Sequence, residues 1–90
     1  MFPKELDGAK VLLYTPKGAY GGIKYPNGAT AEAYCYFAIC KYPEDETYYL
    51  FCCNDSFEVV SDWQTGSIEA CIHIATSSYR GEILWNKAME

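Results

Sequence analysis

The chain has 90 residues, of which 50% are hydrophobic and 17% aromatic, and its formal net charge is −5 at pH 7. This length allows one domain, residues 1–90, with room for a single sheet and about one helix. The acidic balance disfavours nucleic acid and anionic membranes as direct partners, because binding to a phosphate surface requires clustered positive charge. We therefore expect no nucleic-acid partner and no membrane partner.

The carboxylates are concentrated in one half of the chain. Residues 1–43 contain five basic and three acidic side chains. Residues 44–79 contain no Lys or Arg and seven acidic side chains, namely Glu44, Asp45, Glu46, Asp55, Glu58, Asp62 and Glu69. This pattern allows a basic protein partner, and it equally fits a solvated face that keeps a small protein soluble.

The thiols and the histidine form no recognisable chemical site. The chain has an odd number of cysteines, Cys35, Cys40, Cys52, Cys53 and Cys71. We see no secretory signal before them, so we expect a cytoplasmic protein with reduced thiols. No cysteine pair has the spacing of a zinc knuckle, and His73 is the one histidine that could activate a thiol. We predict no catalytic residue, no metal and no cofactor, and a small thiol- or metal-dependent enzyme stays the least favoured alternative.

The first 30 residues predict one strand followed by a loop. Residues 9–14 are mostly apolar and end before Pro16, which cannot donate to a sheet ladder, so they predict a strand. Residues 17–30 are dense in Gly and Pro and predict a long irregular loop that has room for a short extended piece at residues 23–25.

Residues 31–41 are aromatic and apolar with little polar alternation, which predicts a central strand covered on both faces. A helix over residues 31–36 is the alternative, since this part contains two alanines and a glutamate. In the strand, one face carries Cys35, Phe37 and Ile39, and the other face carries Tyr34, Tyr36, Ala38 and Cys40.

A hairpin and a helix are predicted to follow. Residues 48–53 and 57–60 suit two strands, and residues 54–56 (Asn-Asp-Ser) suit the tight turn between them, so residues 31–60 predict an antiparallel meander. Ser67 can cap a helix that ends at Gly81 in the left-handed conformation. The helix would place an apolar stripe on the sheet, formed by Ile68, Cys71, Ile72, Ala75 and Tyr79.

Two features of the C-terminal third stay open at this point. The alternation of β-branched residues at 72–76 also allows a strand. Residues 82–86 suit a short terminal strand or a tail that is held down by Trp85. The fold class that we predict is α+β, with a three- to four-stranded, mostly antiparallel sheet and one helix packed on a face.

The predicted partner-binding site joins aromatic side chains to the acidic turn that follows residue 41. Its members are Tyr42, Glu44, Asp45, Glu46, Tyr48 and Trp63. Aromatic anchors surrounded by carboxylates suit a cationic partner. The alternative is that the acids form a solvated turn, that Tyr48 or Tyr49 covers an open sheet face, and that Trp63 belongs to the core.

The last 40 residues or so resemble a pattern in small uncharacterised bacterial proteins, some of which look like immunity proteins that neutralise a companion toxin. The resemblance covers residues 48–85. It is carried by Tyr48 to Cys52, Phe57 to Val60, Asp62-Trp63, Ser67 to Glu69, Ala75, Tyr79 to Gly81 and Trp85. It implies a binding role and no catalytic residue. Residues 1–40 do not match the pattern, and the helical segment 72–76 is less acidic than the pattern's helix.

The function that we predict is therefore a non-enzymatic binding protein, either toxin-neutralising or regulatory, with a basic protein partner. The alternative from another class is a structural protein that forms a homodimer. Its contact would be an edge strand, for which residues 11–14 are the candidate because they carry no charge, or an aromatic patch.

Overall fold

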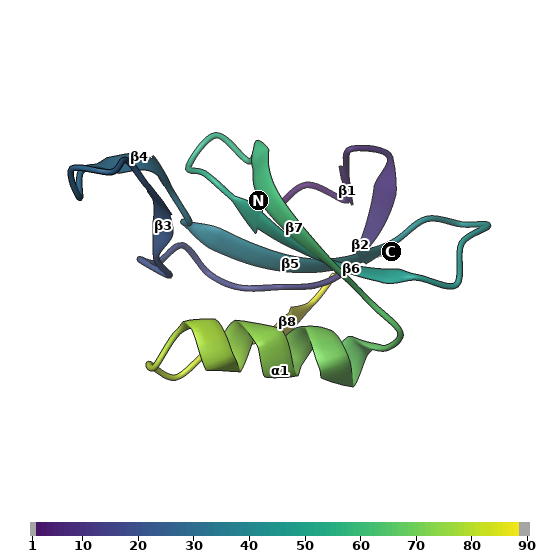
Figure 1. Cartoon of the computed structure of the whole chain (residues 1–90). Coiled ribbons are helices and arrows are strands. Elements are labelled where there is room, and N and C mark those ends of the chain that lie inside the picture. The colour runs from purple at the N-terminus through teal and green to yellow at the C-terminus, as the bar shows by residue number, and fades with distance from the viewer. Residues whose placement is uncertain (1, 89–90) are drawn as a thin grey trace.

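The computed structural model of the chain describes residues 2–88 and shows a curled antiparallel sheet with one helix across it (Figure 1). The strands of the main sheet follow the order β1-β2-β5-β6-β7, and β8 also pairs with β2. A separate hairpin is formed by β3 and β4. The elements are β1 (Glu5–Leu6), β2 (Ala9–Tyr14), β3 (Gly22–Lys24), β4 (Thr30–Ala33), β5 (Tyr36–Lys41), β6 (Tyr48–Cys53), β7 (Val59–Thr65), α1 (Ile68–Ser78) and β8 (Asn86–Lys87).

The α+β class with one packed helix is confirmed, but the predicted three to four strands are too few. The main sheet has six strands because β1 and β8 both join it beside β2. Leu6 of β1 pairs with Ala9, and Lys87 of β8 pairs with Leu13. Strands of two residues are too short to show an alternating pattern, and they form because β2 offers them a partner.

Strand β2 is not an edge strand, which corrects the expectation for residues 11–14. It pairs with β5 along one side and with β1 and β8 along the other. Two further hydrogen bonds join β2 to the residues next to these short strands. The Val11 N–H donates to the Lys4 carbonyl (3.0 Å), and the Ala88 N–H donates to the Leu12 carbonyl (3.0 Å). The open edge of the sheet is β7 instead, which pairs only with β6 among residues 2–88.

The predicted meander is present as β5, β6 and β7. Asn54 organises the turn, since its side-chain oxygen accepts from the N–H groups of Ser56 and Glu58 at 3.0 Å each. The following Phe57 has a φ of 61°, so it belongs to the turn rather than to the predicted strand 57–60. Strand β7 begins at Val59 and runs to Thr65, well beyond the predicted end.

The predicted strand 31–41 is two strands that belong to different sheets. Strand β4 pairs with β3 in an arm that projects from the body of the protein (Figure 1), and β5 begins after Cys35. The chain changes direction where the Gly18 N–H donates to the Cys35 carbonyl and the Tyr20 N–H donates to the Tyr34 carbonyl, both at 2.9 Å. The predicted loop 17–30 therefore contains β3 and the first residue of β4.

Both faces of the sheet are covered. On the face toward α1, called here the helix face, the buried residues are Tyr20, Phe37, Ile39, Leu50, Cys52, Cys71 and Ala75. On the opposite face, called the aromatic face, the buried residues are Leu6, Ala9, Val11, Ala38, Cys40, Phe51 and Cys53. The aromatic face is covered by half-buried rings, which include Phe2, Tyr14, Tyr36, Tyr42, Tyr49 and Phe57. The predicted alternation of Phe37 and Ile39 with Ala38 and Cys40 is thus confirmed, whereas Tyr34, predicted on the face of Ala38, packs on the helix face because it precedes β5.

The helix begins as predicted and ends earlier than predicted. The Ser67 Oγ accepts from the Ala70 N–H at 3.0 Å, which caps the first turn. The helix over residues 68–78 excludes the alternative strand at 72–76. Tyr79 then leaves the helix in an extended conformation and places its ring edge-on against Tyr20, with 5.0 Å between the centroids.

Gly81 is therefore not the left-handed end of the helix, and this prediction is wrong. A Cβ at Gly81 would lie about 2.6 Å from the Tyr79 hydroxyl, so any other residue here would displace the Tyr79 ring. Farther along, Trp85 stacks on Phe37 with 6.4 Å between the centroids. This contact confirms that Trp85 holds down the C-terminal segment, and β8 follows it directly.

Candidate functional site

The turn between β5 and β6 fixes one of its three acids and exposes the other two. The Asp45 carboxylate accepts from the Thr47 N–H (2.9 Å) and from the Tyr49 hydroxyl (3.2 Å). These hydrogen bonds, above all the one from Thr47, lower the pKa of Asp45. Glu44 and Glu46 are exposed to solvent. Asp45 therefore shapes the turn, and its two neighbours present negative charge.

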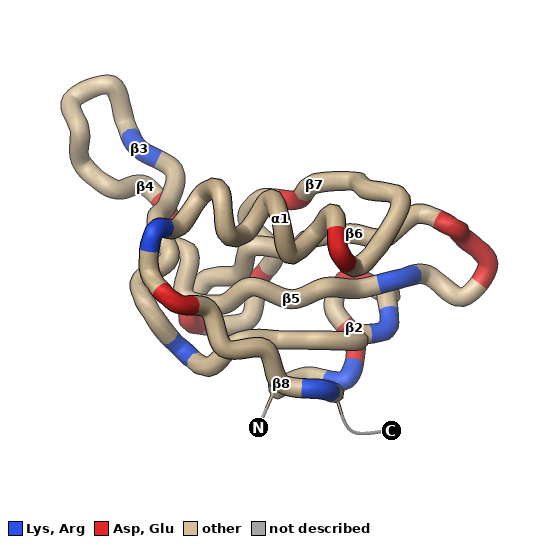
Figure 2. The backbone as a smooth tube through the Cα atoms, turned by 90° about the horizontal axis from the view of Figure 1, so that it is seen from below, with Lys and Arg blue, Asp and Glu red and all other residues tan. Residues whose placement is uncertain are grey.

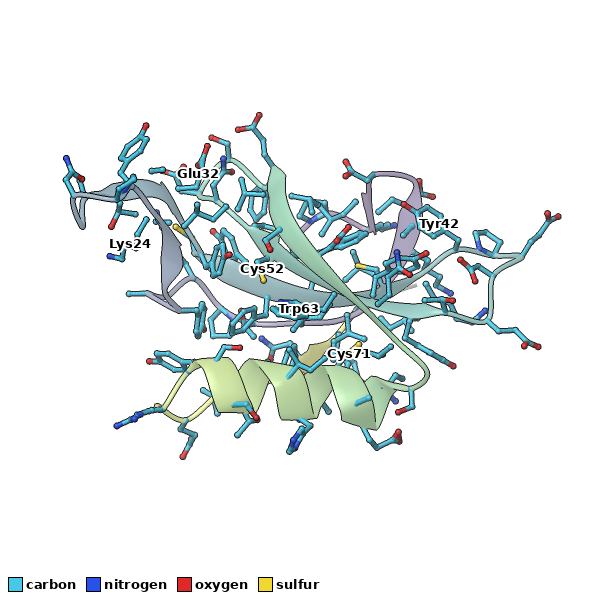
Figure 3. The ribbon with its side chains drawn as sticks, in the orientation of Figure 1. Lys24, Glu32, Tyr42, Cys52, Trp63 and Cys71 are labelled. Atoms are coloured by element: carbon cyan, nitrogen blue, oxygen red, sulfur yellow. The ribbon has the colours of Figure 1, made fainter. Side chains whose placement is uncertain are left out.

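Tyr42 is tied to the protein on the aromatic face of the sheet. Its hydroxyl donates to the Asp7 carbonyl at 3.0 Å, and its ring lies edge-on to Tyr49 with 5.4 Å between the centroids. Figure 3 shows Tyr42 on the opposite side of the sheet from α1. This side chain holds the turn to the loop between β1 and β2, so it has little freedom to serve as an anchor for a partner.

Tyr48 and Trp63 lie together on the helix face, on neighbouring strands. Tyr48 pairs with Thr65, and Trp63 pairs with Leu50, which places the two rings at diagonal positions across β6 and β7. Trp63 is 51% exposed, whereas Tyr48 is half-buried and has the Lys41 ammonium 6.0 Å from its ring centroid. Trp63 is thus a surface residue and not the core residue of the alternative interpretation.

The structure consequently divides the six predicted site residues into two groups. The turn residues Tyr42, Glu44, Asp45 and Glu46 stand at one end of β5 and β6, while Tyr48 and Trp63 belong to the helix face. Asp62 is not among the six predicted residues, yet it is exposed and neighbours Trp63 in β7. The alternation of Ser61, Asp62, Trp63, Gln64 and Thr65, with its β-forming Trp and Thr, could have shown that the strand continues past Val60.

The negative charges lie around three elements, β6, β7 and α1, and in the turns at both ends of β6. Figure 2 shows acidic positions on β7, near the start of α1 and in the turn between β5 and β6. The exposed carboxylates of this half are Glu44, Glu46, Asp55, Glu58, Asp62 and Glu69. The opposite edge, along β2 and β8, has an open groove of about 790 Å³ whose lining includes Lys4, Lys10 and Lys87. This groove is lined by three lysines and one acid, Glu5, whereas β7 carries the exposed Asp62 and no Lys or Arg.

The buried thiols are poor nucleophiles. Burial raises the pKa of Cys52 and of Cys53 to about 12 each, and it also raises the pKa of Cys40. Burial raises the pKa of Cys71 as well, partly offset by its contact with the Thr65 hydroxyl at 3.1 Å. His73 is exposed on α1. Within residues 2–88, no three His, Cys, Asp or Glu side chains are grouped so that they could hold a metal ion.

Comparisons of the chain with protein-family models, with curated proteins and with solved structures gave no match. In the part of the chain that the structure describes, no helix combines the length and the apolar character that crossing a membrane requires. The candidate site therefore rests on the geometry and charge of the chain itself.

Proposed function

We propose that the protein is a non-enzymatic binding protein that recognises a basic protein partner through its acidic half, residues 44–79. The observation that carries this proposal is the separation of charge. Six exposed carboxylates surround β6, β7 and α1, and this half of the chain contains no Lys or Arg. A one-sided negative surface raises the rate at which a basic partner arrives in the right orientation.

The half-exposed Trp63 can supply binding affinity, which exposed carboxylates alone do not provide. Exposed charge pairs contribute little net affinity, whereas a Trp that becomes desolvated in an interface is a frequent hot spot. Trp63 and Asp62 are neighbours on β7 and point to opposite faces of the sheet, so the strand carries an aromatic anchor on one face and a carboxylate on the other. Aromatic anchors surrounded by a polar rim are typical of protein interfaces.

The biological role that we propose for this binding is toxin neutralisation or regulation. The resemblance of residues 48–85 to immunity-like bacterial proteins supports the first of these, and it covers the same strands and helix that carry the acidic surface. A binding role also agrees with buried thiols whose pKa values lie far above neutrality.

The test is capture of a partner by the immobilised protein from a lysate of its host, with association rates measured at low and high salt. The Glu44→Gln/Glu46→Gln variant should bind several-fold more slowly and show a flatter salt dependence, because it loses steering charge. Its matched control, Glu5→Gln/Glu82→Gln, removes the same charge from exposed positions outside the acidic half. Equal effects of the two variants, or no capture at low salt, would contradict the proposal.

A homodimer is the second candidate, and the observation that favours it is a pair of exposed apolar side chains on the β3-β4 arm, Ile23 and Tyr25, which a second copy would cover. Light scattering over a wide concentration range decides this point. A mass that stays that of the monomer would exclude the dimer as the working form.

A further inference from the structure

Strand β7 is the longest strand of the sheet, and in the described part of the chain it has a partner strand along one side only. It has seven residues, while β1 and β8, which close the other edge, have two residues each. In an antiparallel strand every second residue directs its N–H and C=O away from the neighbouring strand. Among residues 2–88, β7 pairs with β6 on one side only, so these groups of β7 have no partner strand along its other side. An edge of this kind can accept an additional strand.

The side chains of β7 differ on its two faces. Trp63 lies on the helix face opposite Leu50, and Asp62 lies on the aromatic face opposite Phe51. A strand added beside β7 would place alternate side chains next to Trp63 and next to Asp62. Cationic side chains are favourable at both places, through cation–π contact with the indole and through pairing with the carboxylate.

A second copy of this chain is a poor occupant of the same edge. Asp62 is the middle residue of β7, so a symmetric antiparallel pair that used the full strand would place Asp62 directly opposite Asp62. Like charges in this position are destabilising. The register shift between Cys52 and Cys53 also leaves an irregularity near the start of β7, a device that limits pairing of edges.

We propose, on the basis of the binding function given above, that β7 is the contact strand: an extended, basic segment of the partner protein adds to its free edge as a further antiparallel strand. Backbone hydrogen bonds to β7 then supply most of the affinity. Asp62 and Trp63 select a cationic segment over an acidic one and over a second copy of this chain.

The test uses a synthetic peptide of about eight residues that alternates lysine and valine, long enough to span β7 at roughly 3.3 Å per residue. Two peptide controls accompany it. One replaces every lysine by glutamate, and the other keeps the sequence but carries an N-methyl group on every backbone amide nitrogen, so that neither of its edges can donate to a strand. Amide hydrogen exchange and titration shifts, followed by NMR, report which residues of the protein each peptide protects.

We expect the lysine peptide to slow the exchange of those β7 amides that face away from β6. Neither control peptide should do so. The Asp62→Lys variant should bind the lysine peptide about tenfold more weakly, while the Glu82→Lys variant, with the same change of charge at an exposed position outside β7, should bind it almost unchanged.

Three outcomes would overturn the inference. The lysine peptide could leave the β7 amides unprotected, or the N-methylated peptide could bind equally well, which would make the contact a purely electrostatic one. In a third outcome, exchange of these amides would slow without any peptide as the protein concentration rises, which would show that a second copy pairs with the edge. The salt-dependent capture experiment is independent of all three, so the two proposals can fail separately.

Discussion

The two edges of the main sheet differ in whether a further strand pairs with them among residues 2–88. At one edge, β2 is closed by the two short strands β1 and β8, and lysines line the groove beside them. At the other edge, β7 has no strand beyond it among residues 2–88, and it carries the exposed Asp62 and Trp63. Unprotected edges favour aggregation, so proteins normally cover them or charge them. Here one edge is covered, and the other is protected by charge and by an irregular register.

The comparison teaches which edge can take part in binding. A covered edge can be opened only by breaking native pairing, such as the hydrogen bond from the Val11 N–H to the Lys4 carbonyl. An edge protected by charge repels a copy of itself and still attracts a segment of opposite charge. Under the proposal made above, the charge on strand β7 would both disfavour pairing between copies and favour a basic partner.

The largest effect that we predict concerns β5 and β6, the strands that join the two edges and bury Cys40, Cys52 and Cys53. Folding raises the pKa of Cys52 and of Cys53 from 9.0 to about 12. Between pH 9 and pH 12 these thiols ionise in the unfolded chain but stay protonated in the folded protein. Ionisation therefore stabilises the unfolded state, and the free energy of unfolding, unaffected below pH 9, falls as the pH rises from 9 to 12. We expect the free energy of unfolding to fall by about 3 kcal/mol for each thiol at pH 11.

Urea unfolding at pH 8 and pH 11 measures this loss. The Cys52→Ala/Cys53→Ala variant is the control, because it should lose less stability over the same pH range even if it starts from a lower value. An equal loss in both proteins would show that other groups govern alkaline unfolding.

The second prediction compares truncations at the two edges. Leu6 on β1 is only 5% exposed, whereas Trp63 on β7 is 51% exposed. Leu6→Ala should lower the free energy of unfolding by about 3 kcal/mol through lost burial and a cavity. Trp63→Ala should lower it by less than about 1 kcal/mol and should speed dissociation from the partner about 30-fold, which corresponds to about 2 kcal/mol.

Thermal melts of the two free variants and dissociation rates of their complexes supply these values. A large drop in the melting temperature of Trp63→Ala would make this residue structural, and the site would then lose its anchor.

The smallest effect concerns self-association. Asp62→Val removes the central charge of the open edge, so we expect weak, concentration-dependent dimers by light scattering at about 100 μM and above. The matched change Glu5→Val on β1 should leave the protein monomeric, since a strand of two residues offers little edge to pair. Association of both variants alike would show that added apolar surface, rather than the β7 edge, causes it.

Several parts of the fold could be predicted from local chemistry. The Ser67 cap, the apolar stripe through Cys71 and Ala75, and the Asn54 turn all depend on residues close in sequence, and the structure contains all three. Such features follow from hydrogen bonds and helical periodicity that a short segment determines by itself. They were enough to define an α+β domain.

The rest depends on contacts between distant residues. Strands β1 and β8 exist because β2 pairs with them, and the break at Tyr34 and Cys35 exists because the backbone of Gly18 and Tyr20 binds there. The local sequence pattern predicts neither effect. Aromatic and apolar residues continue without interruption from Tyr34 to Phe37, across the point where the chain changes direction. In the candidate site, Trp63 and the exposed acids could be named from the sequence, but the open edge of β7 could not, because an edge is a property of strand order.

Amide hydrogen exchange of the free protein tests the central claim, an open β7 edge opposite a covered one, most directly. We predict that alternate amides of β7, those that face away from β6, exchange at nearly unprotected rates. The Val11 amide, bound to Lys4 at the covered edge, should exchange at least about a hundredfold more slowly. If every amide of β7 were as protected as that of Val11, the edge would not be open, and the account of β7 as the contact strand would be wrong.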